Sequence, residues 1–521
     1  MTTRKDIENA LMRGADSLRD TLDAANYKDY VLPIMFFKYL SDSYLDELEK
    51  LAKQYPDVRR LKRQKAYLPF TIVEEASFQK LFEQRNSKNL GQLINTTLRK
   101  IEDDNHHQLV GVLSAVDYNN ETNLGNRDHR NAILRDLLND FVDLDLRPSQ
   151  IEVKENQIPA DVIGDAYEYM IGEFASMAGK KAGSFYTPAA VSEIMARIVN
   201  AKSGERIYDP TCGSGSLLIK AAKRLEKSQV SIYGQEVNGS SVSMAKMNMF
   251  IHQINDAHIE WGDTLANPLF LDADGNLMLF DVIVANMPFS KDKWAAGFNT
   301  GGEAVGKGKK EFKMEASLDK HHRFKWCVPP ASKGDWAFLL HMIASCSSKG
   351  RIAAVAPHGV LFRGGAEGII RKKVIDENLL DAVIGLPENV FLGTTIPACI
   401  LIFKKDRKNK DVVFVDASKK DDAGKLRFIK GKNQNILEEK HINDIVQAYQ
   451  ERKNISRFAH VAPLKEIKEN DYNLNIPRYV DTYEEEEIID IDEVRLNIKR
   501  LKTEIAKTES KMDGYLKELG L

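Results

Sequence analysis

Residues 207–219 read Ile-Tyr-Asp-Pro-Thr-Cys-Gly-Ser-Gly-Ser-Leu-Leu-Ile, and this stretch decides the fold that the sequence predicts. Two apolar residues lead into Asp209, a turn with glycines follows, and an apolar helical stretch comes after the turn. Gly213 and Gly215 permit a tight turn and a close approach of the backbone to a ligand. Because the stretch lacks a GxGxxG pattern, it does not suit a pyrophosphate. Asp209 suits a cationic amino group such as that of a methionine moiety, although an ordinary strand–turn–helix corner has the same layout.

Short apolar runs around this stretch alternate with helical stretches, which is typical of βαβ units and a mostly parallel sheet. We therefore expect an α/β fold, a Rossmann-like, doubly wound sheet that binds its ligand beyond the carboxyl ends of the strands. The expected strands are residues 206–208, 230–234, 280–285, 351–356, 382–386 and 398–403.

The chain of 521 residues is long enough for several domains. We expect a helical domain at 1–160, a catalytic domain with the sheet at 161–430, and a C-terminal region at 431–521. In the first, the apolar residues 29–42 predict a buried helix. A second apolar series recurs every three or four residues, which is the spacing of one face of a helix. It consists of Leu11, Ala15, Leu18, Leu22 and Ala25.

The last part of the chain predicts a long helix from Asp492 onward with a heptad pattern. Such a seam pairs either with a partner helix or with the helix's own domain, and its regularity slightly favours the partner. The positions that form the seam are Val494, Ile498, Leu501, Ile505, Thr508, Met512, Tyr515 and Leu519.

Acidic and basic residues nearly cancel, at 76 against 74, which gives a formal net charge of −2. A chain that binds DNA unaided is more often basic, so any DNA contact must use local patches or be shared with a partner. One basic cluster is either a solvated helix face or a phosphate-contacting patch. It consists of Arg59, Arg60, Lys62, Arg63 and Lys65.

The four cysteines are scattered and form no CxxC pair, which argues against a disulfide framework and a zinc cluster. His321 and His322 lie near Cys327 but lack a second pair of ligands, so we expect a solvated basic loop and no metal. The first residues lack the apolar core of a signal peptide, and no apolar run approaches the roughly 20 residues that span a bilayer. We therefore expect a cytoplasmic protein.

Residues 291–335 interrupt the alternation of strands and helices, and a loop of this length is usually functional or mobile. Residues 301–308 imitate a phosphate-binding P-loop. Because Gly308 stands where Ser or Thr is required, and no strand precedes the stretch, we expect no such site.

Two further carboxylates follow strand candidates. Glu236, in Gly234-Gln-Glu, is placed to accept hydrogen bonds from both hydroxyls of a ribose. Asp263, in Gly262-Asp-Thr, is either an ordinary turn residue or an acceptor for an adenine amino group.

The stretch Asn286-Met-Pro-Phe289 ends the strand candidate 280–285 and indicates the reaction. It resembles the [Asn/Asp/Ser]-Pro-Pro-[Tyr/Phe/Trp] motif of amino-methyltransferases. The Asn286 side-chain oxygen and a following backbone carbonyl can hold the hydrogens of an exocyclic amine and localise its lone pair. Phe289 offers a flat face to a base turned out of a duplex. Met287 replaces the first proline of the motif and lacks its restraint on φ.

Upstream, residues 184–188 read Ser-Phe-Tyr-Thr-Pro and precede the helical residues 189–198. The Thr-Pro step predicts a helix start with Thr187 as N-cap and Pro188 as the first helical residue. Phe185 and Tyr186 are placed to pack on a cofactor.

In the order FYTP, DPTCGSGS, GQE, GDT and NMPF, these motifs resemble those of the gamma-class DNA N6-adenine methyltransferases. The similarity is greatest to the modification (HsdM) subunit of type I restriction–modification systems, and it covers nearly the whole chain. The segments DYVLPIMFFKYLSD, DWAFLLHMI, GRIAAVAPHGVLFRGGAEGIIR, GLPENVFLGTTIPACILIF and NDYNLNIPRY are similar to that family as well.

The resemblance implies an S-adenosylmethionine-dependent enzyme that methylates a flipped adenine in double-stranded DNA. It assigns the target base to Asn286, Pro288 and Phe289, the ribose of the cofactor to Glu236, and the cofactor's adenine to Asp263. The remaining cofactor residues that it implies are Ser184, Phe185, Tyr186, Thr187, Pro188, Asp209, Thr211, Cys212, Gly213, Ser214, Gly215 and Ser216, with Asn286 contacting both ligands.

The resemblance also implies partners, because a separate specificity subunit selects the DNA sequence in that family, usually with two modification subunits, and a nuclease subunit joins for restriction. Two alternatives stay open at this point. One is an amide or amine methyltransferase that acts on protein or RNA, since similar motifs serve glutamine side chains. The other is a non-catalytic assembly subunit that binds the cofactor, which the departure at Met287 motivates.

Overall fold

The computed structural model describes residues 1–179, 186–223, 225, 231–298, 314–392, 394–432, 434–481 and 491–519. The chain divides into two compact units, Met1–Asp481 and Thr482–Leu521. In the described residues, no helix combines the length and the apolar character that crossing a membrane requires.

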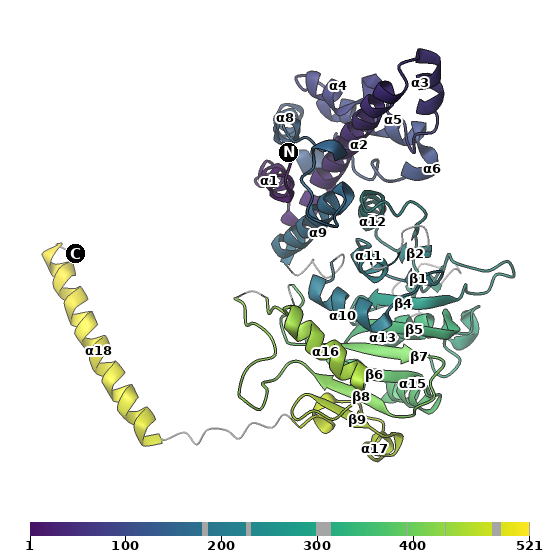
Figure 1. The fold of residues 1–521 in the computed structure, drawn as a ribbon. Coiled ribbons are helices and arrows are strands. Elements are labelled where there is room, and N and C mark those ends of the chain that lie inside the picture. Colours follow the sequence, from purple (N-terminus) through teal and green to yellow (C-terminus); the bar gives the residue numbers. More distant parts are fainter. Residues whose placement is uncertain are drawn as a thin grey trace, which may run out of the picture. The chain divides into compact units, whose positions relative to one another are not determined.

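Nine strands of the described residues form one sheet in the order β3-β2-β1-β4-β5-β7-β6-β8-β9 (Figure 1). The strands are β1 (Arg206–Asp209), β2 (Ser231–Glu236), β3 (His258–Trp261), β4 (Phe280–Asn286), β5 (Cys346–Pro357), β6 (Leu380–Gly385), β7 (Ala398–Lys404), β8 (Val412–Asp416) and β9 (Ala459–Ala462).

Most neighbouring strands are parallel, and the exceptions are β7, which is antiparallel to β5 and β6, and β9, which is antiparallel to β8. From β1 the sheet extends through β2 and β3 in one direction and through β4 and β5 in the other. The strand order therefore reverses between β1 and β4, and such a switch point is where an open α/β sheet binds its ligand. The expected doubly wound, mostly parallel sheet is confirmed.

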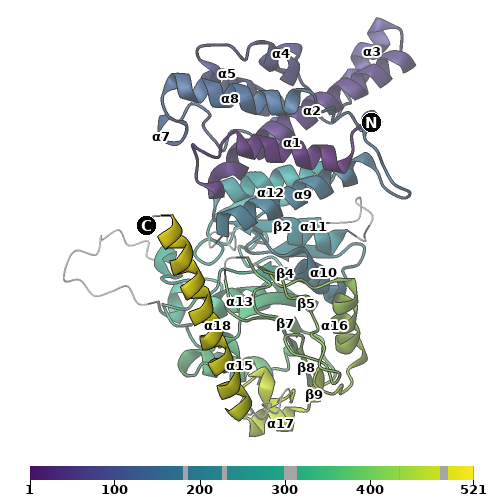
Figure 2. The same ribbon diagram turned by 90° about the vertical axis from the view of Figure 1, so that its left-hand side faces the viewer.

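Helices cover both faces of the sheet (Figure 2). One apolar core lies beneath α10 (Ala189–Val199), α11 (Ser216–Ala222) and α16 (Glu439–Glu451). A second core lies beneath α13 (Asp335–Ala344) and α15 (Gly365–Asp376) on the other face. The short α14 (Gly359–Phe362) follows β5, and α17 (Leu464–Glu469) follows β9.

The amino-terminal region is helical, as expected. It comprises α1 (Arg4–Asp16), α2 (Tyr27–Gln54), α3 (Val58–Lys65), α4 (Phe78–Glu83), α5 (Leu90–Asp104), α6 (His106–Leu109), α7 (Glu121–Leu124), α8 (Arg127–Val142) and α9 (Pro159–Ala178). The predicted buried helix at 29–42 lies within α2. Side chains of α12 (Gly239–Ile251), the helix that follows β2, join the amino-terminal core.

The helical spacing of Leu11 to Ala25 does not reflect one continuous helix. The helix α1 ends at Asp16, and Leu18 and Leu22 lie in the turns that follow it. These leucines are nevertheless buried. Because a turn that folds back on the same core buries the same residues as another helical turn, the spacing alone does not distinguish the two.

The predicted C-terminal helix is present as α18 (Ile491–Glu518). The apolar side chains of its heptad seam are exposed, from 43% at Val494 to 74% at Leu519. This leaves a continuous apolar face on the described part of unit Thr482–Leu521.

Candidate functional site

Three carboxylates meet at the carboxyl edge of neighbouring parallel strands. Asp209 is the last residue of β1, Glu236 is the last residue of β2, and Asp263 follows β3 after two residues. The register pairs Asp209 with Gly234 and Glu236 with Trp261. Because these strands run in the same direction, all three carboxylates lie at one edge of the sheet, as the sequence predicts.

A cavity of about 270 Å³ opens at this edge. The predicted site residues that line it are Thr211, Glu236, Asp263, Asn286 and Pro288. Sequence reasoning missed the other lining residues, among them Val237 and Lys291. Val237 is 58% exposed, so it offers an apolar surface to a ligand, and Lys291 supplies the cavity with a cation.

Asp209 is only 2% exposed and does not line the cavity itself, although the next two residues, Pro210 and Thr211, do. Its Oδ1 accepts a hydrogen bond of 2.8 Å from the backbone N–H of Thr211. Burial raises the pKa of Asp209 to about 8, although the Thr211 hydrogen bond opposes the rise. The charge of Glu236 raises this pKa further. A cationic group bound next to Asp209 would therefore lower the raised pKa of this carboxyl and stabilise its ionised form.

Glu236 joins the ends of β1 and β2. Its Oε2 accepts from the Gly213 N–H over 3.1 Å, and its Oε1 accepts from the Asn238 N–H over 2.8 Å. Burial raises the pKa of Glu236, and the positive charge of Lys291 opposes that rise. The carboxylate is thus held at the cavity wall by backbone donors on either side.

The glycine turn has the tight backbone conformation that the sequence predicts. Gly213 and Gly215 have φ values of +53° and +76°. The positive φ of Gly215 favours glycine, and a Cβ atom there would also require the end of the Met249 side chain, 2.9 Å away, to shift. Beside them, Cys212 is buried and Ser214 Oγ lies 3.0 Å from Ser216 Oγ.

Asp263 both stabilises its own turn and lines the cavity. Its Oδ1 accepts from the N–H groups of Leu265 and Ala266, at 2.9 and 3.2 Å. The neighbouring Thr264 hydroxyl donates to the Pro210 carbonyl over 2.6 Å, which joins the loops after β3 and β1. The two interpretations of Asp263 in the sequence are therefore compatible.

Asn286 ends β4 and points its side-chain amide at α10. The Nδ2 group donates to the Thr187 hydroxyl over 3.1 Å. The predicted helix start is wrong by one residue, because α10 begins at Ala189 and Pro188 is its N-cap, without a side-chain hydrogen bond. The Thr187 hydroxyl serves Asn286 instead of capping the helix.

The rest of the Asn286–Phe289 stretch divides between core and surface. Met287 is 2% exposed and packs into the core beneath α13, whereas Pro288 is exposed. Phe289 is half-buried, and its ring meets that of Phe391 edge to face at a centroid distance of 5.9 Å. Sequence reasoning missed Phe391, which lies about 100 residues further along the chain.

The structure does not bring every predicted residue to this cavity. Tyr186, Thr187 and Ser216 line a neighbouring cavity of about 470 Å³. Tyr186 packs against α9, where a Cβ on Gly172 would lie 3.1 Å from its hydroxyl. The predicted contacts of Ser184 and Phe185, and residues 301–308, lie outside the described residues.

The stretch around His321 is not a solvated loop throughout, which corrects the sequence expectation. Arg323 is 3% exposed and donates to the carbonyl of Leu265 over 2.6 Å and to Oδ1 of Asp319 over 2.8 Å. It also contacts Nδ1 of His341, whose pKa burial lowers well below its usual value. Arg323 therefore holds the loop that carries Asp263. The burial of an arginine cannot be predicted from the sequence when its partners lie far away along the chain.

Comparison with known proteins agrees with this geometry. Residues 159–488 match the family model of the N-6 DNA methylases, and residues 7–141 match that of the HsdM N-terminal domain. The type I restriction enzyme MpnII methylase subunit of Mycoplasma pneumoniae is 33% identical over 96% of this chain and 95% of its own length. The MjaVIII methylase subunit of Methanocaldococcus jannaschii is 31% identical over 98% of this chain and 84% of its own.

A crystal structure of a type I restriction–modification methyltransferase subunit from Streptococcus thermophilus is also similar. It has a TM-score of 0.76 and 35% identity, and the match covers 92% of this chain and 100% of that one. The chain therefore belongs to the N-6 DNA methylase family and, within it, to the methylase subunits of type I restriction enzymes.

Proposed function

We propose that the chain transfers a methyl group from S-adenosylmethionine to the N6 amino group of an adenine turned out of double-stranded DNA. The observation that carries the proposal is that Glu236, Asp263 and Asn286 line one cavity at the switch point of the sheet. A donor and a target base can meet in such a cavity only if residues for both line it.

The residues at the sheet edge fit the cofactor. Asp209 would pair its carboxyl with the amino group of the methionine part of the cofactor. The turn from Thr211 to Ser216 contains two glycines, so its backbone could approach the methionine part closely. Glu236 is placed for the ribose hydroxyls and Asp263 for the adenine, beside the apolar surface of Val237. When bound, the cofactor would supply a methyl group activated by a sulfonium.

Asn286 would activate the target base. Because its Nδ2 already donates to Thr187, its Oδ1 faces the substrate as an acceptor for one hydrogen of the amine. The carbonyl that follows accepts the other, so the lone pair is localised for attack. Phe289, which contacts Phe391, would flank the base, and Pro288 would restrain the backbone just before Phe289. Positioning and electrostatics would carry the catalysis. The bond between sulfur and the methyl carbon would break as the N–C bond forms, leaving a neutral thioether, and the methylated amine would release its extra proton to solvent without a general base.

We propose that the chain acts in the cytoplasm with a separate specificity subunit, as one of two modification subunits, and that a nuclease subunit joins for restriction. The exposed seam of α18 supports a helical partner, because an apolar stripe of this kind is usually covered in an assembly. We also propose that the chain consists of a helical domain at residues 1–160, a catalytic domain at 161–430 and a C-terminal region at 431–521.

The test is reconstitution of the purified chain with its specificity subunit and S-adenosylmethionine labelled in the methyl group. We expect label in DNA, recovered as N6-methyladenine at one sequence. Label in protein or RNA would favour the amide or amine methyltransferase instead. Cofactor binding without transfer to any of the three would identify a non-catalytic assembly subunit.

A further inference from the structure

The loop that follows Asn286 is attached to α13 through a single carboxylate. The backbone N–H of Ser290 donates to Oδ1 of Asp335 over 2.6 Å. Ser290 has a φ of +49°, a left-handed conformation that a non-glycine residue adopts at a cost and keeps only when its surroundings hold it. The hydrogen bond thus fixes a strained residue directly after Phe289.

Asp335 is itself held from the opposite side. It is completely buried, and its Oδ2 accepts from Nη2 of Arg363 over 2.9 Å. Arg363 follows α14, so Asp335 connects the loop after β4 with the loop after β5. The guanidinium also lies 2.9 Å from Glu367, a second buried carboxylate. A buried carboxylate with a cationic partner and a backbone donor is a rigid anchor.

Other contacts anchor the chain only further downstream. The carbonyl of Lys291 accepts from Gly334 over 3.0 Å, and the N–H of Lys293 donates to Ala331 over 3.0 Å. These bonds hold residues 291–293 against the segment before α13. Among the described contacts, the bond to Asp335 is the one that reaches the residue adjacent to Phe289.

We propose that Asp335, held by Arg363, is a positioning residue for the target-base loop, and that it sets the direction of the backbone from Met287 to Phe289. The inference rests on the proposed function, since it concerns how the acceptors of the target amine are oriented. In the motif that the chain resembles, a proline restrains the position of Met287. Here the anchor at Ser290 provides the restraint from the other end of the loop.

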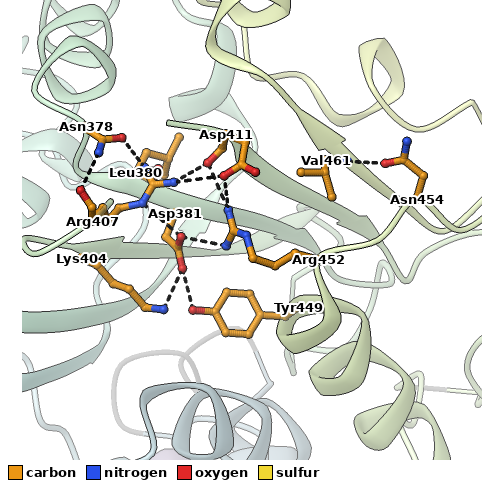
Figure 3. A network of polar contacts seen from close by, with 10 residues as sticks. All are labelled: Asn378, Leu380, Asp381, Lys404, Arg407, Asp411, Tyr449, Arg452, Asn454 and Val461. Carbon is orange, nitrogen blue, oxygen red and sulfur yellow. Dashed lines mark hydrogen bonds and ion pairs between the residues drawn. The ribbon is translucent and has the colours of Figure 1, made fainter. Parts of the chain in front are cut away.

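The variant Asp335→Ala removes the anchor, and Asp381→Ala is its matched control. Asp381 is also a buried aspartate bound to arginines, but it lies at the amino end of β6, at the opposite edge of the sheet from the site. Its carboxylate accepts from Arg407 over 3.1 Å, from Arg452 over 2.9 Å and from the hydroxyl of Tyr449 over 2.7 Å. Figure 3 shows this network. Loss of either carboxylate removes one acidic partner from a partly buried arginine, and among the described ion pairs Arg363 keeps only Glu367 as Arg452 keeps only Asp411. Both variants should therefore lose stability.

Single-turnover methyl transfer, normalised to molecules that bind the cofactor, separates the two variants. We expect Asp335→Ala to lower this rate by on the order of 100-fold at nearly unchanged cofactor and DNA affinity, because small misplacements of reacting groups have effects of this size. Asp335→Asn, which keeps an acceptor for Ser290, should recover most of the rate. Asp381→Ala should react at the normal rate. Equal rates for Asp335→Ala and Asp381→Ala would overturn the inference.

Hydrogen exchange of the peptide that spans residues 286–292 gives a readout independent of methylation. We expect faster exchange there in Asp335→Ala and no change in Asp381→Ala. If the wild-type complex transfers no methyl group to DNA, the proposed function fails, and exchange still decides the inference. Unchanged exchange in Asp335→Ala would refute the anchor whatever the reaction.

Discussion

The side-chain amide of Asn286 donates to the hydroxyl of Thr187 over 3.1 Å, and this bond joins the end of β4 to the start of α10. It holds the side-chain amide of Asn286, which lines the cavity, against the segment before α10. Without this bond the amide can rotate by half a turn. Its NH₂ group would then face the amino group of the target base, and two donors would meet with no acceptor between them. Thr187 therefore matters for the orientation of Asn286.

Replacing Thr187 by valine should slow methyl transfer by about 2- to 12-fold, which corresponds to the usual 0.5–1.5 kcal/mol of one hydrogen bond. Thr187→Ser retains the hydroxyl and should react nearly as the wild type does. The measurement is the single-turnover rate at saturating cofactor. A valine variant as fast as the serine variant would remove this orienting role.

Replacing Asn286 by alanine should abolish transfer and largely preserve cofactor binding, because the acceptor for the target amine is lost while Asp209 and Glu236 remain. Asn286→Asp keeps an acceptor oxygen and should retain part of the activity. Calorimetry gives the affinity and labelled methyl transfer gives the rate. Full activity of the alanine variant would exclude Asn286 from its proposed role.

The stability of the cofactor-free chain should fall as the pH rises through the range in which Asp209 titrates. Its pKa is about 8 in the folded chain, against 3.8 as the ordinary value. Below the ordinary pKa the carboxyl is protonated in both states. Between the two pKa values the unfolded chain has released a proton that the folded chain keeps, which costs up to about 1.4 kcal/mol per pH unit.

Asp209→Asn removes that titration, so its free energy of unfolding should depend less on pH than that of the wild type. Urea unfolding at several values between about pH 5 and pH 8 measures the difference between the two proteins, in which other titrating groups cancel. Parallel curves for the two proteins would show that Asp209 is ionised in the folded chain.

Arg323→Met should destabilise the chain by about 3–5 kcal/mol, because it leaves the buried carboxylate of Asp319 without its cation. Adding Asp319→Leu should recover part of that loss, since an apolar pair can replace a buried ion pair. Both variants should bind the cofactor more weakly, because the loop of Asp263 loses the donor to Leu265. Urea unfolding and calorimetry measure the two effects.

Charges placed in the seam of α18 should prevent assembly with the specificity subunit. We expect Leu501→Glu with Ile505→Glu to weaken the complex by at least about 100-fold, given the usual value of 1.5–3 kcal/mol for burying each side chain. Thr503→Glu with Ser510→Glu adds the same charge outside the seam and should assemble normally. Size-exclusion chromatography of the mixed subunits detects the complex. Normal assembly of the first variant would contradict a role for the seam.

Much of the sheet could be predicted, because strands buried on both faces appear as continuous apolar runs. The strand β3 was missed because His258–Trp261 is polar and forms an edge. The strand β8 is fully buried, yet its five residues directly follow a basic stretch that suggests a loop. The apolar pattern is therefore least successful at predicting strands that lie next to charged segments.

The predicted site residues Asp209, Glu236 and Asn286 were recognisable because each follows a strand, and topology brings strand ends together. Arg323 and Asp335 were not, since a charged residue in a polar stretch predicts solvent. Their burial depends on partners such as Leu265 and Ser290, which are 58 and 45 residues away in the chain. Only the fold reveals such pairs.

The reversed direction of β7 has a consequence for how this enzyme family can change its substrate. Because β7 runs against β6, β6 ends and β7 begins at the same edge of the sheet as Asp209 and Glu236, so their connection does not cross a face of the sheet. This hairpin connection carries Phe391 to Phe289. Insertions in that one connection can therefore change the surroundings of Phe289 while the strands that carry Asp209, Glu236 and Asn286 keep their places.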